Sequence, residues 1–539
     1  MNNDSSKPLR VAIVVPAKRF LCLGSLLWFQ RYGPLQVASV VGDAGYFVRV
    51  LNEELGIRVS AEELACSYDV VGFSAKSSAI PRAEELAKHI KTEAKERGRQ
   101  VVTVLGGEHA SMCEGSRLSE YFDYVLPGES EDAFVFLLKA LDLERGADRK
   151  VLHVLPRRRF CTCQSFNNIP DLSLVHGYEE TVKGFVFRYL PPLWALKNKM
   201  LPMLTFQGTR GCPYGCSFCP TPRYLQGNEY RRRSRDSALS YLQEHIARSG
   251  IRRVIFEDPT AAIAFDEECH KFFESLARSS IRMKATALAR ADLCQDERLL
   301  KVMRAAGVAN LSVGIESLND QTRRDFKKKT SYDTIVRSID IFHEHGFSVT
   351  GLFIVGYDTD DLDSFDRIEK FINETGIEKW KVSPLTQVLE LPDQFMPAHR
   401  FFLWDEFACF DLDVIDYGNG EFVLFYPKYI KPSTLQKSIM TFNKSSTSVT
   451  SLIKLFFSQK RLSPVLQRIG NNLAQRIIQN EVVRSNYIEM VQEVEKPFYV
   501  KQNGMEELQE DLLKKRYEGK AEVCEAPRPK WRGFCLHKR

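Results

Sequence analysis

The sequence predicts an α/β protein with an N-terminal doubly wound parallel sheet, a partial parallel (β/α)6 barrel and a mainly helical C-terminal domain. Short apolar runs alternate with helical segments over residues 9–140 and again over residues 203–390. This alternation is typical of parallel sheets with right-handed crossover connections. From about residue 400 the alternation gives way to amphipathic stretches. The length of 539 residues suffices for three or four domains.

The composition is that of an ordinary globular protein. Apolar residues make up 44% and charged residues 27% of the chain, which excludes long disorder and collagen-like repeats. Lys and Arg number 75 against 69 Asp and Glu, and the resulting charge of +6 is too small to favour a nucleic-acid partner. The apolar stretch 20–29 has half of the ~20 residues that a membrane span needs, so we expect it in the core.

The cysteine content favours metal or redox chemistry. The chain has 13 cysteines, an odd number, and its N-terminus shows no apolar export signal. We therefore expect a cytoplasmic protein and not a disulfide scaffold. Cys161 and Cys163 form a CxC that we interpret as ordinary residues, and the tail cysteines Cys524 and Cys535 receive no role.

The N-terminal half is predicted to form one parallel sheet. Its strands are expected at residues 9–16, 46–54, 69–78, 100–109 and 123–130, with helices at 36–45 and 85–98 among them. Ligands of such sheets bind beyond the carboxyl ends of the strands. The strand ends carry Pro16, Ser74 to Ser78, Gly106, Gly107, Gly128 and Glu129. The small residues among them would let a backbone approach a bulky ligand. Tight strand-to-helix turns would use the same residues, so both interpretations stay open.

A less regular, basic segment over residues 151–200 is predicted to link this sheet to a second α/β run. Six strands are expected in that run, at residues 202–208, 252–258, 283–289, 309–317, 348–358 and 378–386. Six strand–helix units in about 190 residues form a partial or full parallel barrel, whose ligands bind at the carboxyl ends of the strands.

The segment GTRGCPYGCSFCP directly after the first barrel strand carries the chemistry. It places Cys212, Cys216 and Cys219 in a C-x3-C-x2-C motif. Three thiolates on one loop can bind three irons of a [4Fe–4S] cluster and leave the fourth iron open. Zinc is the rival, but a structural zinc site needs four ligands. Gly211 and Gly215 are expected to let the loop turn tightly around the cluster.

This motif resembles that of the radical S-adenosylmethionine superfamily, whose barrel is of the TIM type. The resemblance implies that the open iron binds the amine and carboxylate of S-adenosylmethionine, which is cleaved to a 5′-deoxyadenosyl radical. It also implies cofactor contacts from Glu257 and Asp258 (methionyl amine), Arg290 (carboxylate), Gly314 and Glu316 (adenosine and ribose) and Gly356 (adenine side). Taken singly, Arg290 or Glu316 could equally form a salt bridge at the barrel rim.

The N-terminal sheet, which is Rossmann- or flavodoxin-like, resembles the cobalamin-binding subgroup of that superfamily, and the resemblance covers residues ~10–390. It implies cobalamin contacts from Ser74, Ser77, Ser78, Gly106, Gly107, Gly128 and Glu129. The Asp-x-His-x-x-Gly motif that supplies a cobalt ligand in many cobalamin domains is absent from the sequence, because His89 and His109 stand in other contexts. The resemblance therefore implies a lower cobalt face without imidazole, approached by the segment around Lys76, whose side chain could equally be solvated.

Four segments follow from the resemblance: a cobalamin-binding domain (1–150), a linker (151–200), a radical S-adenosylmethionine barrel (201–395) and a mainly helical C-terminal domain with a tail (396–539). They imply a C-methyltransferase that acts on an unactivated carbon and draws electrons from a flavodoxin or ferredoxin. Alternatives are cyclisation, oxidation or rearrangement without methyl transfer, or a cobalamin or Fe–S carrier. The sequence identifies no catalytic side chain, and QVLELPDQF (387–395) replaces a Pro-Gly-Thr stretch of the family, which leaves the substrate loop open.

Residues 422–480 contain nine Lys and Arg and no Asp or Glu. With Leu452, Ile453, Phe456 and Phe457 beside Lys454 and Lys460, this composition suits peripheral contact with an anionic membrane surface. A solvated helical subdomain on the barrel is the other interpretation. A membrane contact would favour a lipid or terpenoid substrate such as a hopanoid, whereas a peptide, an antibiotic precursor or a tetrapyrrole also stays open.

Overall fold

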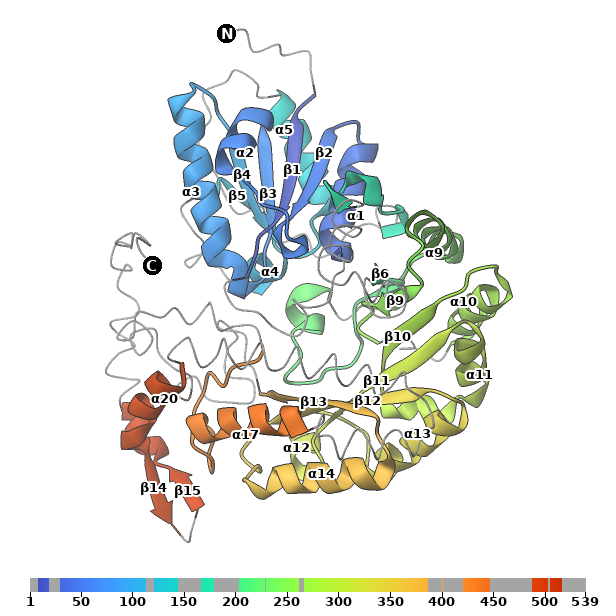
Figure 1. The fold of residues 1–539 in the computed structure, drawn as a ribbon, viewed down its shortest axis with the longest axis vertical. Coiled ribbons are helices and arrows are strands. Elements are labelled where there is room, and N and C mark those ends of the chain that lie inside the picture. Colours follow the sequence, from blue (N-terminus) through green and yellow to red (C-terminus); the bar gives the residue numbers. More distant parts are fainter. Residues whose placement is uncertain are drawn as a thin grey trace, which may run out of the picture.

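The N-terminal domain contains the predicted doubly wound sheet. The computed structural model describes residues 8–18, 30–112, 121–143, 166–178, 203–227, 229–260, 266–385, 400, 420–445, 487–502 and 505–515. The five strands are β1 (Arg10–Val15), β2 (Phe47–Asn52), β3 (Val70–Ser74), β4 (Val102–Gly106) and β5 (Tyr124–Val125). They pair in parallel in the order β2-β1-β3-β4-β5 (Figure 1).

Helices cover both faces of this sheet because both faces are apolar. The helices are α1 (Tyr32–Asp43), α2 (Ala61–Ser67), α3 (Ile80–Glu96) and α5 (Glu131–Leu143). On β1, Val11 and Ile13 belong to the core under α1 and α5, whereas Ala12 and Val14 belong to the core under α2 and α3. A strand buried on both sides has no polar face, which explains the continuous apolar run in the sequence.

The barrel domain is an open sheet of six parallel strands, and all six predicted strands are present. They are β6 (Leu204–Phe206), β9 (Arg253–Phe256), β10 (Lys284–Ala289), β11 (Val308–Glu316), β12 (Ser348–Val355) and β13 (Lys379–Pro384). Their order is β13-β12-β11-β10-β9-β6, so the sheet follows the chain from one edge to the other. The helices around it are α9 (Arg235–Ser249), α10 (Glu267–Arg278), α11 (Glu297–Ala305), α12 (Asp320–Asp325), α13 (Tyr332–Glu344) and α14 (Asp363–Thr375) (Figure 1).

A short antiparallel ribbon that the sequence pattern did not predict follows β6. It pairs β7 (Thr209–Arg210) with β8 (Arg231–Arg232), and Thr209 lies opposite Arg232. The ribbon closes the base of the segment that contains the three motif cysteines.

The described part of the C-terminal domain contains α17 (Pro432–Ser445), α20 (Tyr487–Glu495) and a hairpin of β14 (Tyr499–Gln502) and β15 (Met505–Leu508). Helix α17 packs on β13, where the Asn443 side chain bonds both the N–H and the carbonyl of Val382, at 3.0 and 2.8 Å. Among the helices that the structure describes, none has the length and apolar character that crossing a bilayer demands. The stretch 20–29 and the residues 446–480 lie outside the described residues.

Candidate functional site

A cavity of about 420 Å³ lies between the two domains. Its upper wall is the carboxyl edge of the N-terminal sheet, as expected for a doubly wound fold. The residues from this edge include Pro16, Ser74, Lys76, Gly106, Gly107, Gly128 and Glu129. The opposite wall comes from the barrel domain, through Gln207, Arg210, Leu225, Gln226 and Glu257.

One part of the cavity is an apolar slot in the N-terminal domain. Ile13, Val104 and Phe134 line it, and Gly72 leaves room beside the Phe134 ring. At the strand end, Gly107 has φ +90°, and a Cβ there would lie 2.8 Å from the backbone N and O of Ala75. A slot bounded by such glycines fits a bulky group with an apolar end. The sequence analysis expects a bulky ligand at this edge of the sheet.

Charged side chains surround the mouth of the cavity in pairs. Arg31 binds Glu54 at 2.7 Å, and Lys76 binds Glu108 at 3.0 Å. Burial by itself would raise the pKa of the Glu54 carboxyl, but the charges of Arg31 and the nearby lysines hold it below its usual range. Lys76 thus lines the cavity, its side chain is 37% exposed and its ammonium is paired with the Glu108 carboxylate.

Ser77 and Ser78 do not line the cavity. Both are buried, at 9% and 1% exposed, and the Ser77 hydroxyl lies 3.1 Å from Nδ1 of His109. His109 is itself buried in this contact. Among the described residues that line the cavity there is no histidine.

Glu257 and Asp258 follow β9 and have different surroundings. The Asp258 carboxylate is buried and accepts hydrogen bonds from the N–H of Gly208 at 3.1 Å and the hydroxyl of Thr209 at 2.5 Å, so it fixes the turn after β6. Glu257 lines the cavity, where burial, followed by the charges of Glu108 and Asp258, raises the pKa of its carboxyl to about 7 against the opposing charge of Arg31. Of the two, Glu257 is the one available to a ligand.

The cysteine segment turns sharply where it leaves the ribbon. Gly211 has φ +80°, and a Cβ there would lie 1.9 Å from the carbonyl oxygen of Glu229. The N–H of Cys212 donates to the carbonyl of Gly227 at 3.1 Å, which closes the loop. Gly215 has open space around it, so the predicted need for glycine applies to Gly211 alone.

The three motif cysteines are partly or fully buried on this one loop. Burial raises the pKa of the Cys212 and Cys216 thiols, and the charges of the other motif cysteines raise it further. In the described ranges, no three His, Cys, Asp or Glu side chains converge on a point that would suit a single metal ion. Three thiols on one loop fit a [4Fe–4S] cluster better, because each can bind a different iron.

The cysteine loop packs against the carboxyl ends of the next barrel strands. The guanidinium of Arg290, after β10, lies 3.8 Å above the Tyr214 ring and is paired with Asp292 at 3.0 Å. The N–H of Ser217 donates to the carbonyl of Phe326 at 3.2 Å. The Phe218 and Phe326 rings pack at 5.0 Å. Arg290 therefore forms the rim salt bridge that was one interpretation, and it also contacts the cysteine loop.

Strand β11 ends in a strained residue beside a buried lysine. Glu316 has φ +65°, which is uncommon for a residue other than glycine and often marks a functional site. Lys328 lies 3.1 Å from the Glu316 carboxylate and donates to the carbonyl of Gly314 at 2.8 Å. Its charge also opposes the effect of burial on the pKa of Cys216. The sequence analysis missed Lys328, because it belongs to no recognised motif.

Gly356, after β12, points toward the C-terminal domain. It has φ +103°, and a Cβ there would lie 2.7 Å from the Phe425 ring. Its N–H donates to the carboxylate of Asp360 at 2.8 Å. The described structure therefore surrounds Gly356 with residues that fix the turn after β12.

In the comparison with known proteins, each of the two α/β domains matches a family model. The B12 binding domain model matches residues 30–138, and the Radical SAM superfamily model matches residues 206–372. The bacteriochlorophyllide d C-12(1)-methyltransferase of Chlorobaculum tepidum is 26% identical over 386 residues, which cover 70% of this chain and 76% of that protein. The anaerobic magnesium-protoporphyrin IX monomethyl ester cyclase of Rubrivivax gelatinosus is 25% identical over 57% of this chain, which spans about half (54%) of the cyclase.

A solved structure has the same arrangement of domains. The cobalamin-dependent S-adenosylmethionine radical enzyme OxsB with bound aqua-cobalamin superposes with a TM-score of 0.60, at 14% identity, over 95% of this chain and 84% of that one. At this identity the likeness concerns the fold, and it confirms the predicted fold class. The cofactors that go with the two matched domains are a [4Fe–4S] cluster, S-adenosylmethionine and cobalamin. The chain belongs to the radical S-adenosylmethionine superfamily, among the enzymes that carry an N-terminal B12-binding domain.

Proposed function

We propose that this enzyme methylates an unactivated carbon of a small molecule, with Cys212, Cys216 and Cys219 as the ligands of its [4Fe–4S] cluster. The observation that carries the proposal is the common wall of the two sites: Arg210 and Gln226, which flank the cysteine segment, also line the cavity of the B12-binding domain. When bound, the cluster with S-adenosylmethionine supplies a 5′-deoxyadenosyl radical and cobalamin supplies a methyl group. Reactive groups held on facing walls gain the proximity that such a transfer needs.

In this proposal the barrel rim binds S-adenosylmethionine through three charged side chains. Glu257 accepts from the methionyl amine, and Arg290, held by Asp292 and Tyr214, binds the carboxylate. Glu316, fixed by Lys328, accepts from the ribose. Asp258, Gly314 and Gly356 shape the strand ends and hold the turns that carry these groups.

The B12-binding domain, which we place at residues 1–150 before a linker to about residue 200, holds cobalamin in the cavity. Ser74, Gly106, Gly107, Gly128 and Glu129 line that cavity, and Ser77 with Ser78 supports its wall. Because no histidine is among the described lining residues, we expect the lower cobalt face to have no protein imidazole. Nitrogen superhyperfine coupling from an axial imidazole in the spectrum of bound Co(II) cobalamin would contradict this.

The chain's own residues prepare the site in two ways. The paired charges around the mouth, Arg31 with Glu54 and Lys76 with Glu108, present hydrogen-bonding groups to a polar ligand without net charge. The side chains of Ile13, Val104 and Phe134 give one part of the cavity an apolar lining, which suits a reactive intermediate that has to be kept from side reactions.

The decisive experiment is anaerobic reconstitution followed by mass spectrometry. We expect the reconstituted enzyme to release 5′-deoxyadenosine, and to add 14 mass units to its substrate. Bacteriochlorophyllides and magnesium-protoporphyrin IX monomethyl ester are the first substrates to test, because the similar proteins named above act on tetrapyrroles by name. The triple Cys→Ala variant at 212, 216 and 219 should contain no cluster iron and release no 5′-deoxyadenosine, and unchanged iron content would refute the ligand assignment.

A second candidate, ring closure without methyl transfer, is favoured by the likeness to the cyclase. The same assay separates the two functions. A product that loses hydrogen and gains no methyl carbon, while 5′-deoxyadenosine is still released, would replace the methyltransferase proposal with cyclisation.

We also propose two partners. A flavodoxin or ferredoxin would reduce the cluster, and the basic segment 422–480 would contact anionic lipid surfaces. In the described part of that segment, the apolar Leu435 and Ile439 of α17 are buried and do not face a lipid surface. Each Lys or Arg near an anionic leaflet contributes about 1 kcal/mol. Co-sedimentation with anionic liposomes that is lost at high salt supports this contact, and equal recovery with neutral liposomes argues against it.

A further inference from the structure

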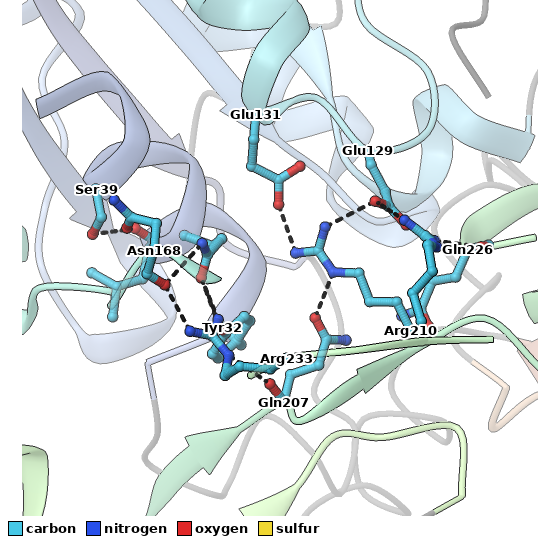
Figure 2. A network of polar contacts seen from close by, with 12 residues as sticks. Tyr32, Ser39, Glu129, Glu131, Asn168, Gln207, Arg210, Gln226 and Arg233 are labelled. Atoms are coloured by element: carbon cyan, nitrogen blue, oxygen red, sulfur yellow. Dashed lines mark hydrogen bonds and ion pairs between the residues drawn. The ribbon is translucent and has the colours of Figure 1, made fainter. Parts of the chain in front are cut away.

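The cysteine segment and the cavity are joined by a buried cluster of four charged side chains, two from each domain. Arg210 and Arg231 come from the ribbon at the base of the cysteine segment, and Glu129 and Glu131 come from the loop after β5 and the start of α5 (Figure 2). Their side chains are 4–12% exposed. We call these four residues the Arg–Glu cluster.

Glu129 is the centre of the Arg–Glu cluster. Its Oε2 atom accepts from Arg210 Nη1 at 3.0 Å and from Arg231 Nη1 at 2.9 Å, and its Oε1 atom accepts from Arg231 Nη2 at 2.5 Å. Arg210 also donates to Glu131 Oε1 at 2.6 Å. Two positive and two negative groups balance, so the loss of any one leaves a buried charge without its partner.

The cluster is bonded to the backbone of the cysteine segment. Arg210 is two residues before Cys212, and Arg231 donates to the carbonyl of Gln226 at 3.0 Å. The side chain of Gln226 in turn accepts from the N–H of Gly211 at 3.2 Å. A displacement of the Glu129 carboxylate therefore reaches the backbone beside Cys212 through hydrogen bonds alone.

The same side chains line the cavity. Glu129, Glu131, Arg210 and Gln226 are all part of its wall. A molecule in the cavity packs against one side of the Arg–Glu cluster, while the cysteine segment is attached to the other side. A ligand can bias a conformation only through a group with which it interacts, and the Arg–Glu cluster is in reach of both sites.

We propose that Glu129 and Arg210 are positioning residues that couple the two cofactor sites. Cobalamin in the cavity holds the Glu129–Arg210 pair in place, and the pair holds the cysteine segment in its cluster-binding conformation. The inference rests on the proposed function, since it assumes that cobalamin occupies the cavity and that the loop cysteines ligate the iron. Because coupling between two binding equilibria is reciprocal, a loaded cluster must strengthen cobalamin binding.

The first test needs no variant. The full chain is reconstituted anaerobically with its cluster, and the release of iron to a chelator is timed with and without hydroxocobalamin. We expect cobalamin to slow iron release at least tenfold and to change the paramagnetic spectrum of the reduced cluster. The Kd for hydroxocobalamin should be at least fivefold weaker for cluster-free protein.

The second test uses Glu129→Gln and Arg210→Lys. At hydroxocobalamin concentrations that saturate each variant, cobalamin should slow their iron release less than twofold. Arg232→Lys is the matched control, because Arg232 is in the same ribbon and pairs at 2.6 Å with Asp266, within the barrel domain. In Arg232→Lys, cobalamin should slow iron release as much as in the parent protein. Arg231→Lys, which weakens the two hydrogen bonds from Arg231 to Glu129 and leaves Arg210 in place, serves if the other two variants do not fold.

The outcomes distinguish a failure of the proposed coupling from a failure of the proposed function. A wild-type chain that binds both cofactors while cobalamin leaves iron release unchanged would overturn the coupling and leave the proposed function standing. A wild-type chain that binds no cluster or no cobalamin would overturn the proposed function itself. Full protection in both Glu129→Gln and Arg210→Lys would remove these residues from the coupling.

Discussion

At the scale of single residues, the pKa of each carboxyl in the site depends on the balance between burial and the charges of its neighbours. Glu257 and Glu54 both line the interdomain cavity and both are carboxylates. Burial and nearby acids raise the pKa of Glu257 to about 7, whereas the charge of Arg31 outweighs burial at Glu54 and lowers the pKa of that carboxyl. As the pH changes, the contributions of Glu257 and Glu54 to the free energy of unfolding therefore change in opposite directions.

Glu257→Gln should stabilise the protein above pH 7. The native state binds the Glu257 proton more tightly than the unfolded chain does, so stability falls as the pH rises from about 4.5 to about 7. Allowing for water in the cavity, the variant should gain about 1–2 kcal/mol in the free energy of unfolding at pH 8 and nothing at pH 4. Urea unfolding across this range, without S-adenosylmethionine, measures the difference.

Glu54→Gln is the control of opposite sign. In the parent protein the pKa of the Glu54 carboxyl is lowered by folding. The carboxylate therefore contributes stability that is present near neutral pH and is lost as the pH falls through the pKa of the folded state. This variant should be less stable than the parent at pH 7. Parallel pH profiles for the two variants would contradict the assigned surroundings.

At the scale of elements, the cysteine segment depends on how its ends are held. Ribbon β7–β8 closes it, and Gly211 makes the turn at a positive φ directly against the backbone of Glu229. Gly215, between two of the cysteines, has open space instead. The two glycines look alike in the sequence and carry different constraints.

Gly211→Ala should lose most of its cluster iron after reconstitution, at least fivefold relative to the parent, because a Cβ would lie 1.9 Å from the Glu229 carbonyl and force the loop apart. Gly215→Ala should keep close to full iron content, since nothing lies within 4 Å of its new methyl group. Iron and sulfide analysis with the spectrum of the reduced cluster measures both. Equal iron content in the two variants would mean that the ribbon does not define the loop.

At the scale of the whole molecule, the two domains are joined by buried polar contacts. Arg233 donates all five of its guanidinium hydrogens. The acceptors are the carbonyls of Gln207 and Asn168 and the side chains of Tyr32, Gln36 and Ser237. Figure 2 shows Arg233 with Tyr32, Asn168 and Gln207 around it. Residues 32 and 36 belong to α1, so this side chain fastens the N-terminal domain to the start of the barrel.

Arg233→Lys should lower the free energy of unfolding by about 2–4 kcal/mol, because a lysine has three donors and leaves buried acceptors unpaired. Limited proteolysis should also cut between the domains faster than in the parent. Arg248→Lys is the control, since its half-exposed pair with Asp171 is worth no more than about 1 kcal/mol. Similar losses in the two variants would argue against Arg233 as the fastening residue.

The sequence by itself determined the order of the domains, the parallel strands of both sheets and the cofactor families. Each of these leaves a local pattern. A strand that is buried on two faces gives a continuous apolar run, as in β1 and β3, and a cluster loop needs its cysteines at short, fixed spacing. Such patterns need no knowledge of distant residues.

Only the tertiary structure decided which residues meet between those elements. Arg210 and Arg231 pair with Glu129 although 81 and 102 positions separate them from it in the sequence. Glu316 likewise pairs with Lys328 across a helix and a turn. An ion pair between distant positions leaves no periodic signal, and a two-residue ribbon such as β7–β8 is too short to show alternation. The common wall of the two cofactor sites is a property of domain packing, because it is made by side chains that the chain brings together only after both sheets have formed.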